Sequence, residues 1–223
     1  MTPRDICVVI PTLNEAAGIA ATIRSANGAG QIIVVDGGSA DGTLEIAQAF
    51  EHVISLVSKP SRGGQLSVGA ARCQLKVVLF LHADCRLCPG ALEHVANSVA
   101  SGHEWGALRQ RIEAAGIQYR LLELGNAARV KLRGIPFGDQ AMFVLAERLR
   151  QVGGIEAIPL MEDLRLARRL RCYSWPALTT ASVMVSARRW SKRGVARQTV
   201  RNWLIQALHA TGMAPEKLAK LYR

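Results

Sequence analysis

Three acidic side chains, Glu15, Asp36 and Asp84, each lie at or just beyond the end of a short apolar run. If these runs are parallel strands, their carboxyl ends meet at one edge of a sheet, where open α/β sheets bind ligands. Acids crowded together repel one another, and a bound cation or hydrogen-bond donors of a ligand relieve that repulsion. A turn or cap residue is the alternative for each acid taken singly. Three in succession favour a binding site.

Two further segments carry groups that could act on a ligand. Arg62 and Gln65 flank a glycine pair at a predicted loop-to-helix junction, where glycine permits close backbone approach and a helix N-terminus attracts anions. Glu162 and Asp163 open a predicted helix. The alternative for the glycine segment is an ordinary turn with an exposed arginine. The alternative for Glu162 and Asp163 is a structural role, in which acids in the first turn complement the helix dipole and pair with nearby arginines.

The segments that carry these residues alternate between strand and helix patterns. Continuous apolar stretches indicate strands buried on both faces. The predicted strands span 6–10, 32–35, 53–57 and 77–81, and the predicted helices span 15–25, 44–50 and 63–75. We therefore predict an α/β fold with a mostly parallel central sheet and helices on both faces.

After residue 85 the pattern is less regular. Predicted helices span 90–100, 116–132 and 160–170, predicted strands span 141–144 and 179–185, and a helical tail runs from about 197 to 223 with breaks at Gly212 and Pro215. The chain has no repeat, low-complexity segment or long linker. We expect a single domain over residues 1–223.

Composition and charge exclude several classes of protein. Apolar residues make up 49% of the 223 residues, which is typical of a globular chain. No apolar run approaches the roughly 18 residues of a membrane span, and Asp5 interrupts any signal peptide. The five cysteines are odd in number and scattered, which favours free thiols in a reducing compartment. These features predict a cytoplasmic protein.

Five segments in order resemble the successive motifs of family 2 glycosyltransferases, which have the nucleotide-sugar-binding fold called GT-A. They are Pro11-Thr-Leu-Asn-Glu15, Asp36-Gly-Gly-Ser-Ala-Asp-Gly-Thr43, His82-Ala-Asp84, Gly153-Gly154 with Met161-Glu162-Asp163, and Ser186-Ala-Arg-Arg189-Trp190. The segments at 80–84, 138–140 and 159–163 resemble most closely a branch known as rSAM/selenodomain-associated transferases. The resemblance runs from residue 6 to residue 223. It implies a nucleotide-binding half at 1–105 and an acceptor-side half with a basic helical C-terminus at 106–223.

The resemblance implies a role for each matched residue on the donor side. A UDP- or GDP-sugar would be bound by Pro11, Glu15, Asp36, Arg62, Gln65 and Asp84. Within this set Glu15 and Asp36 would contact the base and ribose, and Asp84 would coordinate Mg²⁺ or Mn²⁺ that bridges the diphosphate. His82 stands where many members of the family have an acid.

On the acceptor side the resemblance makes Asp163 the general base that deprotonates the acceptor hydroxyl. Glu162, Arg189 and Trp190 would lie near the diphosphate and the acceptor, and Ser186 replaces the glutamine of the family motif. Direct displacement with a single base implies inversion at the anomeric carbon. The resemblance therefore predicts a metal-dependent, inverting glycosyltransferase whose acceptor the sequence does not identify.

Two alternatives come from other classes of protein. A sugar-phosphate nucleotidyltransferase shares the predicted fold, but it needs a glycine-rich basic loop where residues 11–15 stand. A non-enzymatic module could bind nucleic acid or a membrane through its basic residues. With 3 Tyr, 4 Phe and 4 Trp and no RNA-binding motif, the chain offers little for base stacking, so we expect no nucleic-acid partner.

The basic excess is confined to the last quarter of the chain. Residues 165–223 hold 13 Lys+Arg and one acid, whereas the formal net charge of the whole chain is +11. Within this tail one helix face is apolar, formed by Val200, Trp203, Leu204, Ala207 and Leu208. This face either packs on the sheet, which we expect, or makes a peripheral contact with anionic lipid at the inner face of the membrane.

Overall fold

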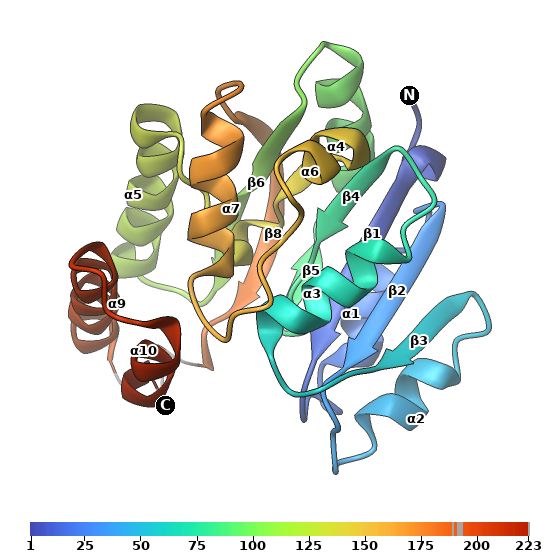
Figure 1. The fold of residues 1–223 in the computed structure, drawn as a ribbon, viewed down its shortest axis with the longest axis horizontal. Helices are drawn as coiled ribbons and strands as arrows, with labels where there is room; N and C mark the ends of the chain where they lie inside the picture. The colour runs from blue at the N-terminus through green and yellow to red at the C-terminus, as the bar shows by residue number, and fades with distance from the viewer. Residues whose placement is uncertain (189, 191–193, 223) are drawn as a thin grey trace.

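An eight-stranded sheet with the order β3-β2-β1-β4-β7-β6-β8-β5 forms the centre of the molecule. The structure is a computed structural model that describes residues 1–188, 190 and 194–222, and Figure 1 shows its helices arranged around this sheet. Alternate side chains of β1 (Ile6–Thr12) enter two different apolar clusters, one on each face. The predicted α/β architecture with helices on both faces is confirmed.

The first half of the sheet is parallel. It contains β1, β2 (Gln31–Asp36), β3 (Val53–Val57) and β4 (Val77–Phe80). On one face Val8 and Ile10 pack with residues of α1 (Ile19–Ser25) and α4 (Ala91–Ala100). On the other face Val9 packs with residues of α3 (Arg62–Ala71) and α7 (Glu162–Arg171). All seven side chains of β1 are buried, because both faces are covered.

The second half of the sheet mixes directions. It contains β7 (Phe143–Leu145), β6 (Trp105–Glu113), β8 (Ala177–Ser186) and β5 (Cys85–Leu87). Strand β7 runs antiparallel to β4 and β6, β8 runs parallel to β6, and β5 runs antiparallel to β8. Strands β5 and β6 were not among the predicted ones. In β6 the alternation of exposed Arg109 and Arg111 with buried Gln110 and Ile112 is a strand pattern that the sequence analysis missed.

Helix boundaries differ from the predicted ones by a few residues. The remaining helices are α2 (Thr43–Gln48), α5 (Ile117–Arg133), α6 (Ala146–Gln151), α9 (Val195–Ala210) and α10 (Pro215–Tyr222), with 3-10 turns at Pro3–Asp5 and Gly138–Gln140. The helix predicted from residue 15 begins only at Ile19. A turn precedes it, in which the carbonyl oxygen of Glu15 accepts hydrogen bonds from Gly18 and Ile19. Helix α6 was not predicted.

The apolar face of α9 does not pack on the sheet, contrary to expectation. Val200, Trp203 and Leu204 are 60%, 67% and 55% exposed, whereas Ile205 and Gln198 on the opposite side are buried. Figure 1 places α9 at the left edge of the molecule, on the side of α5. Within residues 1–188, 190 and 194–222, no helix is long and apolar enough to cross a membrane.

Candidate active site

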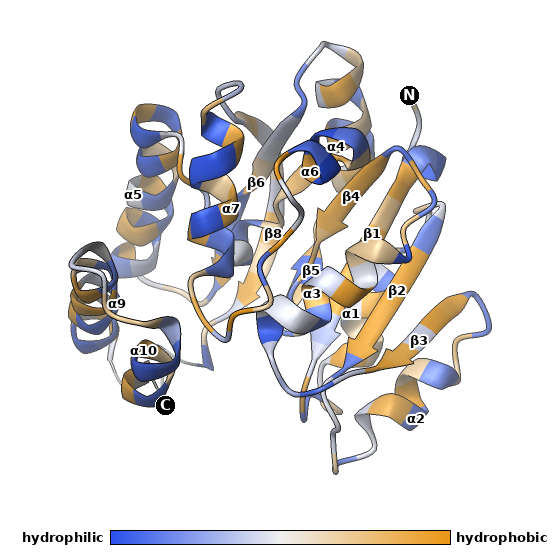
Figure 2. Ribbon diagram, in the orientation of Figure 1, coloured by the Kyte–Doolittle hydropathy of each residue, from blue (hydrophilic) through white to orange (hydrophobic). Residues whose placement is uncertain are grey.

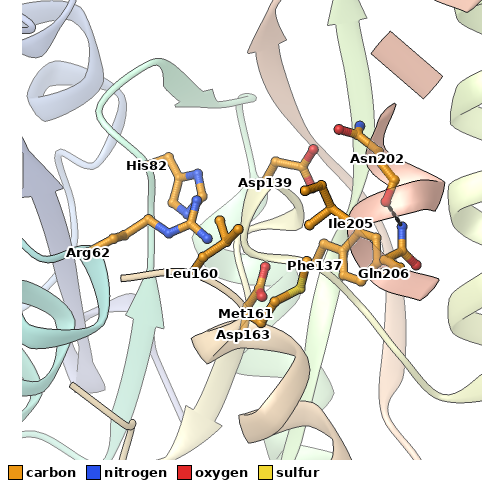
Figure 3. A pocket seen from close by; sticks show the side chains of 10 residues that line it. All are labelled: Arg62, His82, Phe137, Asp139, Leu160, Met161, Asp163, Asn202, Ile205 and Gln206. Carbon is orange, nitrogen blue, oxygen red and sulfur yellow. Dashed lines mark hydrogen bonds between the residues drawn. The ribbon is translucent and has the colours of Figure 1, made fainter. Parts of the chain in front are cut away.

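Two neighbouring clefts lie beyond the carboxyl ends of β1 and β4. The first, called here the β1 cleft, is lined by Pro11, Thr12, Leu13, Glu15, Pro60, Ser61, Arg62, Gln65, His82, Ala83, Asp84, Pro159, Leu160 and Ala219. The second, called here the α7 cleft, is drawn in Figure 3 and is lined by Arg62, His82, Phe137, Asp139, Leu160, Met161, Asp163, Asn202, Ile205 and Gln206. Arg62, His82 and Leu160 belong to both, so the two clefts form one continuous site.

Glu15 lines the β1 cleft and is paired across it. Its Oε1 accepts a hydrogen bond of 2.7 Å from Nη2 of Arg188, which follows β8. The backbone of Glu15 is fixed as well, because its amide donates to Oγ1 of Thr43. Asn14, next to it, has a left-handed backbone with φ of 54°, which is uncommon for a residue other than glycine. The turn after β1 thus holds Glu15 in a set position.

Asp36 lies at the same sheet edge but does not line either cleft in the described part of the chain. It is 1% exposed, and its Oδ1 accepts hydrogen bonds from the amides of Gly38 (2.8 Å) and Ser39 (2.7 Å). Its Oδ2 accepts from the Ser39 hydroxyl. The carboxylate is therefore committed to the turn that follows β2.

The glycine pair of α3 serves packing inside the protein. A Cβ at Gly63 would lie 2.2 Å from the carbonyl oxygen of Glu156, and the Gly63 amide donates to Ile158. The Gly64 amide faces the N-cap hydroxyl of Ser61. Two amides of this helix N-terminus thus have protein partners, and the side chains of Arg62 and Gln65 are the groups of this segment that line the β1 cleft. Figure 3 shows the Arg62 side chain reaching toward the α7 cleft.

Gln65 connects the ends of the first two strands. Its Nε2 donates to the carbonyl oxygens of Thr12 (2.7 Å) and Val35 (2.8 Å) and is buried. Arg62, one turn earlier in α3, pairs through Nε with Oε1 of Glu162. Glu162 is fully buried. Its partner is therefore Arg62 of α3, and not an arginine of its own helix as the alternative reading of the sequence expected. Burial raises the pKa of Glu162, and the Arg62 guanidinium opposes that rise.

Asp163 enters the α7 cleft from the first turn of α7. Its Oδ2 accepts a hydrogen bond of 2.7 Å from the Gly138 amide, and its Oδ1 accepts one of 2.7 Å from Leu164. Met161 precedes the helix with φ of 68°, a left-handed backbone. Such backbone strain clusters at functional sites, because the surrounding structure must maintain it. Because consecutive residues of a helix point in different directions, Glu162 is buried in the interior while Asp163 lines the cleft.

His82 and Asp84 meet a third potential metal ligand, Cys85. One ligand atom of each lies within 4.8 Å of the others. The set offers an imidazole nitrogen, a carboxylate oxygen and a thiol, which together suit a divalent cation of the transition series. His82 also faces Gly138, where a Cβ would lie 2.6 Å from its Nε2 and 3.3 Å from Oδ2 of Asp163. Gly138 thus lies between His82 of the metal-ligand set and the carboxylate of Asp163.

Several residues of the site were not expected from the sequence. Asp139 lines the α7 cleft, and its Oδ2 accepts a hydrogen bond of 2.6 Å from Gln110 of β6. Asn202 and Gln206 reach the cleft from α9. Asp139 could have been predicted, because it is an acid inside a segment that was already matched to the family. No sequence feature pointed to Asn202 and Gln206 of α9.

The last predicted motif is described in part. Trp190 and Ser186 line a small cavity that also contacts His82, Asp84 and Asp139. Trp190 packs against two apolar clusters of the core. Arg189 lies outside the described residues.

The sequence matches a protein family and a curated relative. The family described as Glycosyl transferase family 2 matches residues 7–144. The chain is also 40% identical over 88 residues to Glycosyltransferase AglJ of Haloferax volcanii, a match that covers 37% of this chain and 28% of that protein.

Comparison with solved structures shows the same fold in two proteins. The chain is similar to S. aureus TarS 1–349 with a TM-score of 0.65 and 14% identity over 82% of this chain and 60% of that one; the same TarS fragment has been solved in complex with UDP-GlcNAc. It is also similar to glucosyl-3-phosphoglycerate synthase of Mycobacterium tuberculosis, solved with Mn²⁺, UDP and glucosyl-3-phosphoglycerate. That TM-score is 0.58, with 21% identity over 81% of this chain and 70% of that one. The chain thus spans less than two thirds of AglJ and of the TarS fragment.

Proposed function

The chain belongs to glycosyl transferase family 2, and on that basis we propose that it transfers a sugar from a UDP-sugar to an acceptor hydroxyl, with a divalent metal ion and with inversion at the anomeric carbon. Membership in this family favours sugar transfer over nucleotidyl transfer and over a non-enzymatic role. We favour UDP over GDP because the similar structures were solved with UDP-GlcNAc or UDP.

The β1 cleft is the proposed donor site. Glu15 and Pro11 line it from the end of β1, where the base and ribose of a nucleotide bind in open α/β sheets. Asp36 has its oxygens committed to the turn after β2, so we assign it to positioning that turn. Gln65 likewise positions the ends of β1 and β2, because its side-chain amide donates hydrogen bonds to a carbonyl oxygen of each strand.

His82 and Asp84 fit a divalent metal ion. The ion, when bound, would act as a Lewis acid that neutralises the charge developing on the departing diphosphate. Mg²⁺ prefers oxygen ligands, whereas Mn²⁺ accepts an imidazole nitrogen more readily. The metal-ligand set therefore favours Mn²⁺ over Mg²⁺. We propose that His82, which replaces the usual acid, is the reason for this preference.

Asp163 is the proposed general base. Both of its oxygens accept from backbone amides, which fix the carboxylate and orient it without protonating it. An acceptor hydroxyl in the α7 cleft would give its proton to this carboxylate as its oxygen attacks the anomeric carbon. A single attack opposite the leaving diphosphate inverts the configuration. Arg62 lines both clefts, and we propose that its guanidinium group contacts a phosphate oxygen of the donor.

Acceptor binding is assigned to the rest of the α7 cleft and to Trp190. Asp139, Asn202 and Gln206 provide polar groups along one side of the cleft. Trp190, beside the metal-ligand set, would form an apolar wall, and Glu162 would act indirectly by holding Arg62. Arg189 remains a proposed diphosphate contact from its place in the motif.

The convergence of Arg62, His82, Asp84 and Asp163 from three separate segments on one continuous site is the observation that carries this proposal. A thermal-shift screen tests it with UDP, GDP and several UDP- and GDP-sugars, each with and without Mn²⁺. A ligand at 100 times its dissociation constant stabilises the fold by about 2.7 kcal/mol. We expect a rise in Tm with UDP that depends on Mn²⁺. A larger rise with GDP, or none with any nucleotide, would contradict the proposed donor.

A further inference from the structure

Helix α5 presents an apolar stripe to solvent. Ile117, Leu121, Leu124 and Leu132 recur at helical spacing and are between 60% and 79% exposed. Tyr119 and Val130, on the other side of the helix, are its buried residues. An amphipathic helix normally turns its apolar stripe toward the core. Here the large aliphatic side chains point away from it, and this stripe has no covering element in the described part of the chain.

Helix α9 exposes apolar side chains as well. Val200, Trp203 and Leu204 are more than half exposed. The start of α9 is joined to α5, because Val195 packs against the small cluster that contains Tyr119. Figure 1 shows the two helices at the same edge of the molecule, and Figure 2 shows apolar residues on both. The exposed apolar residues of the two helices are called here the α5–α9 surface.

Basic side chains accompany the α5–α9 surface. The exposed ones on or beside the two helices are Arg109, Arg111, Lys131, Arg133, Arg197, Lys217 and Lys220. Acids are few. Residues 194–222 contain only Glu216, the one acid of α5, Glu123, pairs with Arg120, and Glu113 at the end of β6 pairs with Arg86. A second copy of the chain would place bases against bases. An anionic bilayer matches both the basic and the apolar side chains of this surface, because it has negatively charged headgroups above an apolar interior.

We propose that the α5–α9 surface docks on an anionic lipid bilayer and holds the active site beside an acceptor in that bilayer. The two sides of α9 support this placement, because Asn202, Ile205 and Gln206 line the α7 cleft while Trp203 and Leu204 face solvent. The acceptor side of the site would then lie one helix away from the lipid. The statement about the acceptor rests on the proposed function, whereas the docking itself does not.

Docking would be peripheral and sensitive to salt. Tryptophan favours the membrane–water interface, and leucines beside it would enter the acyl boundary. Each basic residue near an anionic surface strengthens binding by roughly fivefold at low ionic strength, and added salt screens that contribution.

Co-sedimentation with vesicles tests the proposal on the full chain. The vesicles contain phosphatidylcholine with or without about 30% phosphatidylglycerol, a fraction that gives a strongly negative surface. We expect binding to the anionic vesicles at low salt, little to neutral ones, and loss at high salt. Leu121→Gln/Leu124→Gln and Trp203→Gln/Leu204→Gln should each weaken binding at least about tenfold, since each pair removes two inserting side chains. Val57→Gln/Val68→Gln is the matched control, because both valines are exposed elsewhere.

Three results would overturn the proposal. These are no pelleting with anionic vesicles at low salt, equal loss in the control variant, and equal binding to neutral vesicles. A concentration-dependent dimer that the Leu121→Gln/Leu124→Gln variant abolishes would assign the surface to a second copy instead. UDP binding is measured on the same samples. Retained UDP binding with no vesicle binding defeats only the docking, and vesicle binding without UDP binding defeats only the proposed donor.

Discussion

The guanidinium of Arg62 pairs with the fully buried carboxylate of Glu162, although 100 positions separate them in sequence. The pair joins the first turn of α3 to the first turn of α7. It thereby fixes the spacing between the side of the site that holds Gln65 and the side that holds Asp163. A charge buried this completely is costly unless its partner stays in place. The ion pair is therefore one of the contacts that set the relation between the two clefts, together with the packing of Gly63 against the segment before α7.

Arg62→Ala should destabilise the fold by about 3 kcal/mol, because it leaves Glu162 buried without its cation. Burial already raises the pKa of this carboxyl. A raised folded-state pKa means that stability falls as pH rises, so the deficit should be smallest near pH 5 and should grow toward pH 8. Denaturant unfolding at several pH values measures it.

Glu162→Gln in the Arg62→Ala background separates stability from binding. The double variant should regain most of the lost stability and lose its pH dependence, because no buried acid remains to ionise. It should still bind UDP more weakly than the parent, since Arg62 is a proposed phosphate contact. Equal stability of the single and double variants at pH 8 would show that the pair contributes nothing.

Asp163→Asn should lower turnover at least about 10²-fold while donor binding stays near that of the parent. Its amide oxygen can still accept from the Gly138 amide, so the contact with that loop is kept, while the contact with the Leu164 amide is lost. The measurements are kcat with a working acceptor and Kd for UDP with Mn²⁺. Comparable kcat in the two proteins would contradict the role of Asp163 as general base and would leave it a structural role in the first turn of α7.

Asp84→Ala should abolish the Mn²⁺ dependence of UDP binding and leave the melting temperature without ligand within a few degrees. His82→Asp should bind the donor with either metal and lose the preference for Mn²⁺, because it offers a second carboxylate where the imidazole stood. Isothermal titration of UDP in Mn²⁺ and in Mg²⁺ distinguishes the two effects. If the parent shows no preference between the metals, His82 is not a ligand.

Lowering the pH below about 6.5 should destabilise the fold through His209. Burial and the nearby charges of Arg165 and Arg168 lower the pKa of this histidine. A lowered folded-state pKa means that the unfolded chain takes up the proton first, so stability is lost as pH falls. His209→Leu should show a smaller drop in Tm between pH 7.5 and pH 5.5. The same drop as in the parent is expected of His103→Gln, since His103 is exposed.

The parallel half of the fold could be predicted from the sequence because its signals are local. The apolar runs at β1, β2 and β4 became strands buried on both faces, and β3, which is partly exposed, was predicted at its observed bounds. The acids after β1 and β4 could be placed at one edge by the topology alone. Their meeting with Arg62 in the β1 cleft followed from the same alternation.

The rest depends on contacts that no local pattern reports. The partner of Glu162 lies 100 positions away, so helical spacing pointed to its own helix instead. Asp36 has a role in its own turn, which an acid at a strand end does not reveal. The apolar face of α9 has the same periodicity whether it meets the core or solvent, so only the fold could decide between them.

The pairing of β5 with β8 has a consequence for how the protein is made. Strands β1 to β4 are complete once residue 80 is synthesised, but Cys85 pairs with Val185 and the carbonyl of Asp84 accepts from the Ser186 amide. At ribosomal rates the intervening residues take about 5 to 20 s to appear. Over that interval a nascent chain has its nucleotide-side strands without the pairing that fixes Asp84. The proposed metal ligands are therefore held in place only once β8 has paired with β5, and we expect unfinished chains to lack this arrangement.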